Sequence, residues 1–237
     1  RAVAAMPIAG SYRSIDFALS NMTNSHIQKV AVLTQYNARS LNEHLNSSKW
    51  WNFGRKQGGL YVFTPTITND NGYWYRGTAD AIYQNMDFLK KSHEPYVVIA
   101  SGDAVYKMDY SKVLQYHIDK KADVTVVCKE MDPSDDVSRF GTIRMDDDMR
   151  ITEFEEKPMV TKSNMISTGI YVIRRRLLID LIEHAAEEER FDFVNDVLIR
   201  YKNLKKIYGY KIDHYWSNIA TVDAYYKTNM DFLKPEV

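Results

Sequence analysis

Short runs of nearly continuous apolar, β-rich residues constrain the fold of this chain more than any other feature. They lie at residues 29–34, 96–100, 123–129, 168–173 and 205–210. A strand has this composition when both of its faces are covered, because neither face then needs polar residues for water. Between the runs, apolar residues recur at helical spacing at 79–89, 110–118 and 177–182. The alternation predicts an α/β fold, with a mainly parallel (mixed) sheet flanked by helices.

Two local patterns predict finer detail. Thr78 stands where an N-cap is expected before the helical pattern, and Asp80 falls in the first turn, where a carboxylate suits the positive end of a helix. Residues 141–145 and 151–154 flank the acidic run 146–148, which predicts a hairpin at the surface.

The charge and the cysteine content exclude several classes of protein. The 31 Lys and Arg balance the 31 Asp and Glu, so no global field attracts nucleic acid or an anionic membrane, and we expect neither as a partner. The single cysteine, Cys128, lies in an apolar run and forms no disulfide within the chain.

No run reaches the roughly 18–20 apolar residues of a membrane span, and no leader opens the chain. We therefore expect a cytoplasmic protein. The six histidines show no close ligand spacing, so no zinc site is expected.

Asp103 is the first candidate for chemistry. It follows the apolar run 96–100 and the small residues Ser101 and Gly102. In open α/β sheets ligands bind beyond the carboxyl ends of the strands, where a carboxylate can meet Mg²⁺ and a phosphate. An aspartate after a strand is as often a turn or cap residue, so this run by itself leaves both interpretations open.

Several segments, in consistent order, resemble the ADP-glucose pyrophosphorylase (glucose-1-phosphate adenylyltransferase) family. They lie at 7–21, 32–36, 74–81, 101–110, 139–141, 154–158, 167–171 and 215–225. A motif such as Glu-Lys-Pro at 156–158 has little specificity alone, but the ordered set is specific and covers essentially the whole chain. The resemblance implies a Rossmann-like nucleotide-diphospho-sugar transferase fold, with a single nucleotidyltransferase-like domain over 1–237.

The resemblance also implies a reaction and a role for individual residues. In this family an oxygen of glucose 1-phosphate attacks the α-phosphorus of ATP, and ADP-glucose and pyrophosphate form in glycogen biosynthesis. The implied catalytic residues are Asp103 and Arg13, with Mg²⁺ at Asp103 and at the position of Asn218. The implied nucleotide-binding residues are Trp74, Gly77, Thr78, Ala79, Asp80 and Gly102. The implied sugar-phosphate residues are Glu156, Lys157, Ser167, Gly169, Tyr215 and Trp216. Taken singly, Lys157 and Gly77 are more typical of a solvated lysine and a turn glycine; the whole constellation favours the functional interpretation.

The chain departs from the family pattern where charge is expected. Asn218 replaces the second metal aspartate, and Val3 replaces a lysine that would meet the triphosphate. The phosphate-binding glycine-rich loop expected before Arg1 and the β-helix domain expected after Pro235 are both missing from this chain. Removing one preorganised charge typically costs about 10²–10³ in rate, so two such changes predict low activity.

These departures resemble the regulatory subunit of the family, which keeps the fold and modulates a catalytic partner. The resemblance thus implies a hetero-oligomer with a catalytic subunit, ligands that include ATP and glucose 1-phosphate or ADP-glucose, and weak activity of its own. One alternative is a non-enzymatic regulatory or scaffold protein that binds sugar phosphates or nucleotides. Another is a related enzyme that uses a different nucleotide or sugar.

Overall fold

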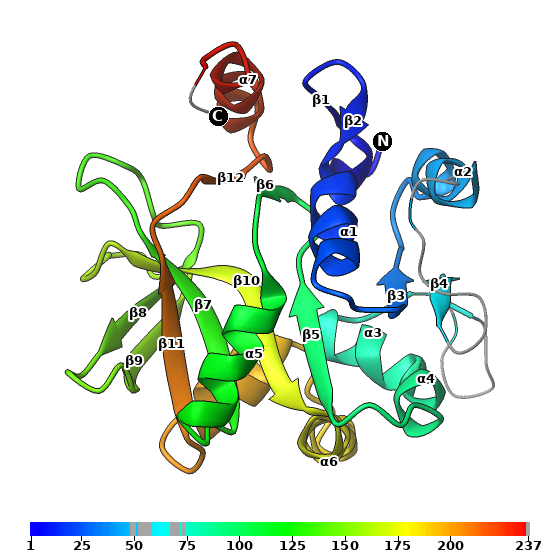
Figure 1. Cartoon of the computed structure of the whole chain (residues 1–237). Helices are drawn as coiled ribbons and strands as arrows, with labels where there is room; N and C mark the ends of the chain where they lie inside the picture. The colour runs from blue at the N-terminus through cyan, green and yellow to red at the C-terminus, as the bar shows by residue number, and fades with distance from the viewer. Residues whose placement is uncertain (48–50, 52–57, 67–71, 73, 236–237) are drawn as a thin grey trace. The chain divides into compact units, whose positions relative to one another are not determined.

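The computed structural model describes residues 1–47, 51, 58–66, 72 and 74–235. The chain forms two compact units, each with its own elements (Figure 1). Unit 1 contains Arg1–Thr64, Ser101–Tyr110 and His214–Val237, and unit 2 contains Pro65–Ala100 and Ser111–Asp213. A single domain over the whole chain stays a prediction.

Unit 2 is built on a six-stranded mixed sheet. The main path runs β11 (Ile207–Ile212), β7 (Val124–Glu130), β10 (Met165–Arg174), β8 (Gly141–Met145) and β9 (Ile151–Glu156), and β5 (Tyr96–Ala100) also pairs with β10. β7 and β11 are parallel, whereas β10 is antiparallel to β5, β7 and β8. β5, β7 and β11 therefore point the same way, and the predicted α/β fold with a mixed sheet is confirmed. Within the described residues its pairings are antiparallel except for β7–β11, so the sheet is not mainly parallel.

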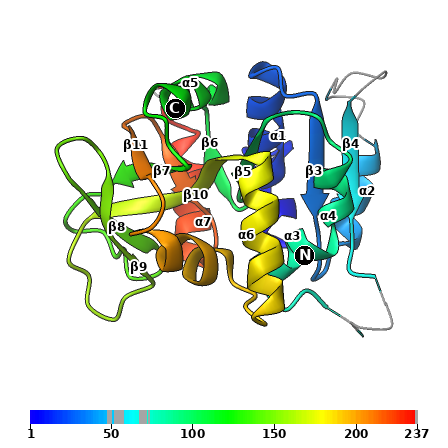
Figure 2. The same ribbon diagram turned by 90° about the horizontal axis from the view of Figure 1, so that it is seen from below.

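Both faces of this sheet are covered, as the apolar runs predict. α5 (Tyr110–Asp119) lies over one face, while α6 (Arg175–Glu187) and the π-helix η2 (Val194–Ile199) lie over the other (Figures 1 and 2). The alternation along β7 shows both contacts: Val124, Val126 and Cys128 belong to the core cluster that includes α6 and η2 side chains. Thr125 points the other way and contacts His117 of α5, whose Nδ1 lies 2.7 Å from its hydroxyl.

The finer predictions have mixed outcomes. β8 and β9 form the predicted antiparallel hairpin around residues 146–148. The helical pattern at 79–89 is two helices, α3 (Thr78–Gln84) and α4 (Met86–Lys90), because Asn85 interrupts it with its side-chain amide bonded to the Ala81 carbonyl. The N-cap prediction for Thr78 is wrong by one residue: Gly77 is the N-cap, and the Thr78 hydroxyl accepts a hydrogen bond from another segment.

Unit 1 has smaller sheets and three longer helices in its described part. β3 (Lys29–Leu33) and β4 (Gly59–Phe63) are parallel, and β6 (Ala104–Tyr106) and β12 (Trp216–Asn218) are antiparallel. The helices are α1 (Ser14–Asn24), α2 (Arg39–Ser47) and α7 (Val222–Asp231); the start of the chain adds η1 (Val3–Ala5), β1 (Pro7–Ile8) and β2 (Tyr12–Arg13). One cluster of its core consists of Ile8, Val105 and Ile219.

Within the described residues, no helix is both long and apolar enough to cross a membrane.

Candidate functional site

In unit 1, Asp103 and Asn218 lie at the ends of two paired strands. Asn218 is opposite Ala104 in the β6–β12 register, and the Ile219 N–H donates to the Asp103 carbonyl at 2.9 Å. The Asp103 carboxylate accepts a short hydrogen bond from Ser101. The Asn218 side-chain oxygen accepts from the Ala220 N–H at 3.0 Å, which fixes the amide in a turn. The two predicted metal positions are therefore neighbours.

Gly102 brings the start of the chain beside Asp103. Its carbonyl accepts from the Ser14 hydroxyl at 2.9 Å. A Cβ at Gly102 would lie 3.0 Å from Ile15 and 3.3 Å from the methyl group of Ala4, so a side chain there would crowd both. Val3, next to Ala4, is 39% exposed. An exposed apolar residue is thus next to Ala4, which approaches Gly102, and the family resemblance implies a lysine in its place.

Arg13, a predicted catalytic residue, is tied to α2. Its guanidinium donates to the Ser40 carbonyl at 2.6 Å and to the Ser40 hydroxyl at 3.0 Å. Its backbone N–H donates to Asp16 at 2.8 Å, and the other Asp16 oxygen lies 2.6 Å from Nε2 of His44. The side chain is therefore positioned by α2, and a catalytic role stays a prediction.

Tyr215 and Trp216 belong to the same unit. The Tyr215 hydroxyl donates to Asp231 of α7 at 3.1 Å, and burial together with the Asp231 charge raises the pKa of Tyr215 to about 12. Trp216 is buried and lies opposite Tyr106 in the β6–β12 register. Both residues fix β12, the strand that ends at Asn218.

The donors at the strand ends fit a weakly held magnesium ion. Asp103 and Asn218 offer carboxylate and amide oxygens, the hard ligands that Mg²⁺ takes. Among the residues that the structure describes, no group of three or more His, Cys, Asp or Glu could hold a metal. Mg²⁺ is commonly bound through one or two carboxylates together with substrate phosphates, and this pair matches the minimal case.

In unit 2, three residues form a row across neighbouring strands. Gly141 on β8 is opposite Glu156 on β9. In the β8–β10 register Ile166 is opposite Thr142, so Ser167, the next residue of β10, lies near the level of Gly141. A Cβ at Gly141 would lie 2.9 Å from Glu156 Oε2, so the glycine gives this carboxylate its room. Gly169 has φ of 75°, at the point where the β7–β10 register shifts. This bulge follows Ser167 directly and places the predicted sugar-phosphate residues at an irregularity of the strand.

The row meets two groups that the sequence reasoning missed, the Asp192 carboxylate and the Tyr171 hydroxyl. Burial raises the pKa of Glu156; the neighbouring Lys157 opposes this effect and Asp192 adds to it. Burial also raises the pKa of Tyr171, whose hydroxyl lies 3.2 Å from that of Ser167. Lys157 has φ of 46°, a left-handed conformation that is uncommon for a residue with a side chain. Its ammonium lies 3.9 Å from a Glu156 carboxylate oxygen, and its side chain is 67% exposed, so it is available to an anion.

The predicted nucleotide segment begins with Trp74, which is 51% exposed. Asp80 is buried, and its carboxylate accepts from the Arg76 backbone N–H at 2.8 Å and from the Arg76 guanidinium at 3.1 Å. Gln84 donates to the same carboxylate at 2.9 Å. Asp80 thus stabilises residues 76–84 through hydrogen bonds within the segment. The prediction that it lies in the first turn of the helix is confirmed.

A turn after α6 contacts the rest of this segment. The Phe191 carbonyl accepts from the backbone N–H groups of Ala79 at 2.8 Å and Asp80 at 3.3 Å. Thr78 accepts from the Phe193 N–H at 2.9 Å. A Cβ at Gly77 would lie 2.3 Å from the Phe191 oxygen, so only glycine permits this approach. Sequence reasoning missed the turn, and Gly77 is its only local signal.

The two groups of residues belong to different units. Asp103, Gly102, Arg13, Tyr215, Trp216 and Asn218 lie in unit 1, and the remaining predicted site residues lie in unit 2. A common cleft for them stays a prediction.

Known proteins resemble this chain along nearly its whole length. The sequence pattern of a family described as Nucleotidyl transferase matches residues 1–235. A glucose-1-phosphate adenylyltransferase from Clostridium novyi is 42% identical over 97% of this chain and 60% of its own length. Proteins of the same name from Bacillus cytotoxicus and Clostridium acetobutylicum are each 43% identical, over 98% and 97% of this chain and 62% and 61% of their own lengths. The chain spans about three fifths of the length of these relatives. With a match that extends over nearly all of its residues, the chain belongs to the nucleotidyl transferase family.

Proposed function

We propose that this chain is part of a glucose-1-phosphate adenylyltransferase subunit of glycogen biosynthesis, of the regulatory type and with weak activity of its own. The observation that supports it best is the pair of strand ends in unit 1, where Asp103 has Asn218 beside it instead of a second carboxylate. The relatives named glucose-1-phosphate adenylyltransferase support the reaction, and the missing charge supports the weak activity.

In the reaction, an oxygen of glucose 1-phosphate forms a bond to the α-phosphorus of ATP, and the bond from that phosphorus to the bridging oxygen of pyrophosphate breaks. Positioning and charge neutralisation are the main tasks of a protein in such a transfer. Lys157, whose exposed ammonium is directed by a left-handed backbone, binds the sugar phosphate. Glu156 and Ser167 contact the sugar from the neighbouring strands.

The nucleotide binds along residues 74–80, with the exposed Trp74 ring against the base. Asp103, with Asn218, holds Mg²⁺ at the phosphates. When bound, the ion would neutralise part of the negative charge on the triphosphate. Asn218 contributes a neutral oxygen, which is also bonded to Ala220, so this side of the site has one full negative charge for the metal. Val3 adds no cation at the triphosphate. Weak turnover with retained binding follows from these two positions.

A non-enzymatic regulator that binds the same ligands is the second candidate, and the same two positions favour it. The two candidates differ in one observable. A weak enzyme releases pyrophosphate from ATP and glucose 1-phosphate, whereas a pure regulator binds the ligands and releases none.

Ligand binding is tested first, by calorimetric titration of the full chain with glucose 1-phosphate. Lys157→Ala should weaken binding by about ten- to a hundredfold, because a charge-assisted hydrogen bond contributes about 1.5–3 kcal/mol. Lys162→Ala is the matched control: this lysine is similarly exposed and pairs with Glu155 at 3.2 Å. If the unchanged chain binds neither glucose 1-phosphate nor ATP, the proposed function is wrong.

A further inference from the structure

The turn that follows α6 contacts the predicted nucleotide segment through several independent interactions. The Phe191 carbonyl accepts hydrogen bonds from the Ala79 and Asp80 N–H groups. These donors belong to the first turn of α3, where N–H groups have no partner within the helix. Gly77 has no side chain to cap these donors, so the turn takes the place of an N-cap. The beginning of α3 is therefore fixed by a distant part of the chain.

Side chains strengthen this contact. The Arg76 guanidinium lies 3.8 Å from the centroid of the Phe191 ring, within the range of a cation–π interaction. The same guanidinium bonds to the buried Asp80. Phe191 thus orients Arg76, and Arg76 joins the two ends of the segment 76–80. The ring is only partly buried, so its loss removes less core packing than loss of the neighbouring Phe193 would.

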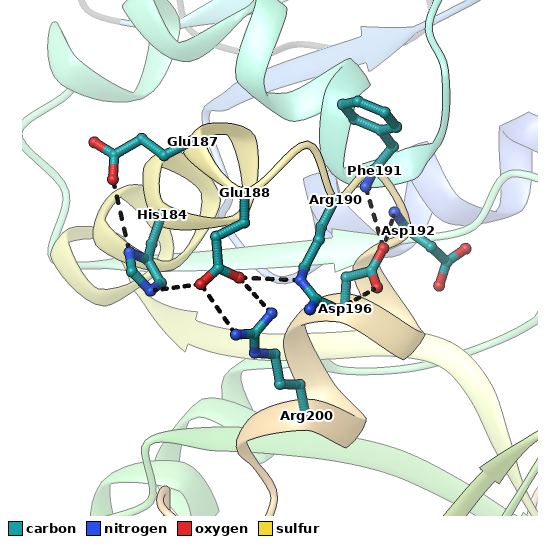
Figure 3. A network of polar contacts seen from close by, with 8 residues as sticks. All are labelled: His184, Glu187, Glu188, Arg190, Phe191, Asp192, Asp196 and Arg200. Atoms are coloured by element: carbon teal, nitrogen blue, oxygen red, sulfur yellow. Dashed lines mark hydrogen bonds and ion pairs between the residues drawn. The ribbon is translucent and has the colours of Figure 1, made fainter.

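The turn is itself held by a network of polar contacts (Figure 3). Asp196 accepts from the N–H groups of Phe191 at 3.1 Å and Asp192 at 2.9 Å. Arg190 bonds to Glu188 at 3.0 Å and lies 3.7 Å from Asp196. Glu188 also accepts from Arg200 at 3.0 Å. Ion pairs that form a network restrict geometry more than an isolated surface pair does.

From these contacts we propose that Phe191 is a positioning residue for nucleotide binding. Its carbonyl and ring place the segment 76–80 while the network of Asp196, Glu188, Arg190 and Arg200 fixes the turn. The inference rests on the proposed function, since it assumes that residues 74–80 receive the nucleotide. It assigns Phe191 no contact with the ligand.

The test compares Phe191→Leu with Phe191→Tyr in the full chain. Leucine keeps apolar bulk and the backbone carbonyl but removes the ring face, and tyrosine keeps the ring. Phe191→Leu should weaken ATP binding about tenfold in calorimetry, the size expected for a lost cation–π contact and its dependent geometry. Binding of glucose 1-phosphate should stay unchanged, and Phe191→Tyr should bind ATP like the unchanged chain.

Hydrogen exchange of peptides covering residues 74–84, measured without ligand, separates this inference from the proposed function. Faster exchange in Phe191→Leu than in Phe191→Tyr is expected, because the carbonyl of residue 191 remains but, without the ring contact to Arg76, is held less firmly against the Ala79 and Asp80 N–H groups. Equal exchange in Phe191→Leu and Phe191→Tyr would overturn the positioning role, whether or not the original chain binds ATP. A lack of both ATP and glucose 1-phosphate binding by the original chain would refute the proposed function separately. Faster exchange with unaltered ATP affinity, or equal loss of affinity for both ligands, would also overturn it.

Discussion

Replacing Gly77 by alanine tests the approach between α3 and the Phe191 turn most severely. The added methyl group would lie 2.3 Å from the Phe191 carbonyl oxygen and 2.8 Å from its carbonyl carbon. Both are backbone atoms, so no change of rotamer relieves the contact. Gly77 has φ of 176°, an extended conformation that alanine adopts without strain, and the steric contact is therefore the main perturbation.

The structure sets the size of the effect. The start of α3 must move by about 1 Å to restore an ordinary van der Waals separation. Overpacking of this kind typically costs about 1–3 kcal/mol, and two backbone hydrogen bonds of about 0.5–1.5 kcal/mol each weaken at the same time. Alanine offsets about 0.4–1 kcal/mol by restricting the unfolded chain. The net loss should be about 2 kcal/mol, which lowers the Tm of a chain of this size by about 4–8 °C.

Thermal unfolding followed by circular dichroism measures the loss, with Gly72→Ala as the control. Among the residues that the structure describes, no atom lies within 4 Å of a Cβ at Gly72, so alanine there has the same effect on the unfolded chain without the contact. Gly72→Ala should match or slightly exceed the unchanged chain. Equal Tm values for the two variants would refute the argument that Phe191 approaches Gly77 so closely.

Two further predictions concern buried groups of unit 2. Burial, reinforced by the Arg174 charge, lowers the pKa of His117 to about 4, so between about pH 6.5 and 4 the unfolded chain binds a proton that the native chain does not. The free energy of unfolding should therefore fall on acidification through this window. His117→Asn, which keeps a partner for Thr125, should reduce that fall by about 2 kcal/mol when urea unfolding at pH 7 is compared with pH 4.5. Identical falls in the variant and the unchanged chain would contradict the assignment. Burial also raises the pKa of Cys128 to about 12, so the thiol should resist iodoacetamide in the native chain and react once the chain is unfolded, and rapid native labelling would show that it is accessible.

The strands were predictable because their sequence pattern is local. Continuous apolar runs identify β5, β7 and β11 with small shifts in their bounds, since covered strands require apolar residues on both faces. Strand direction is not encoded in that pattern. β10 is as apolar as its neighbours, yet it lies antiparallel between β5 and β7.

The candidate site was predictable to the same degree. Asp103 comes soon after the end of β5, with Ser101 and Gly102 between them, so a rule about strand ends finds it. The pairing of β6 with β12 places Asn218 beside it. The Phe191 turn could not be found, because its contact with Ala79 and Asp80 uses a backbone carbonyl that any residue possesses. Thr78 resembles an N-cap because it stands directly before the helical pattern, but its hydroxyl accepts from the Phe193 N–H instead.

The central claim is that turnover is weak because charge is missing where the triphosphate reacts, and the double change Val3→Lys with Asn218→Asp tests it directly. An aspartate at 218 can keep the hydrogen bond from Ala220, and Val3 is exposed, so both new charges fit with little effect on stability. The assay is pyrophosphate release from ATP and glucose 1-phosphate with Mg²⁺, in the full-length protein. The two groups act on one developing charge, so each single change should do little, while the pair should raise kcat by about 10² or more with ATP affinity nearly unchanged. A turnover of about 10 s⁻¹ by the unchanged protein, or a double variant as slow as its parent, would contradict the account.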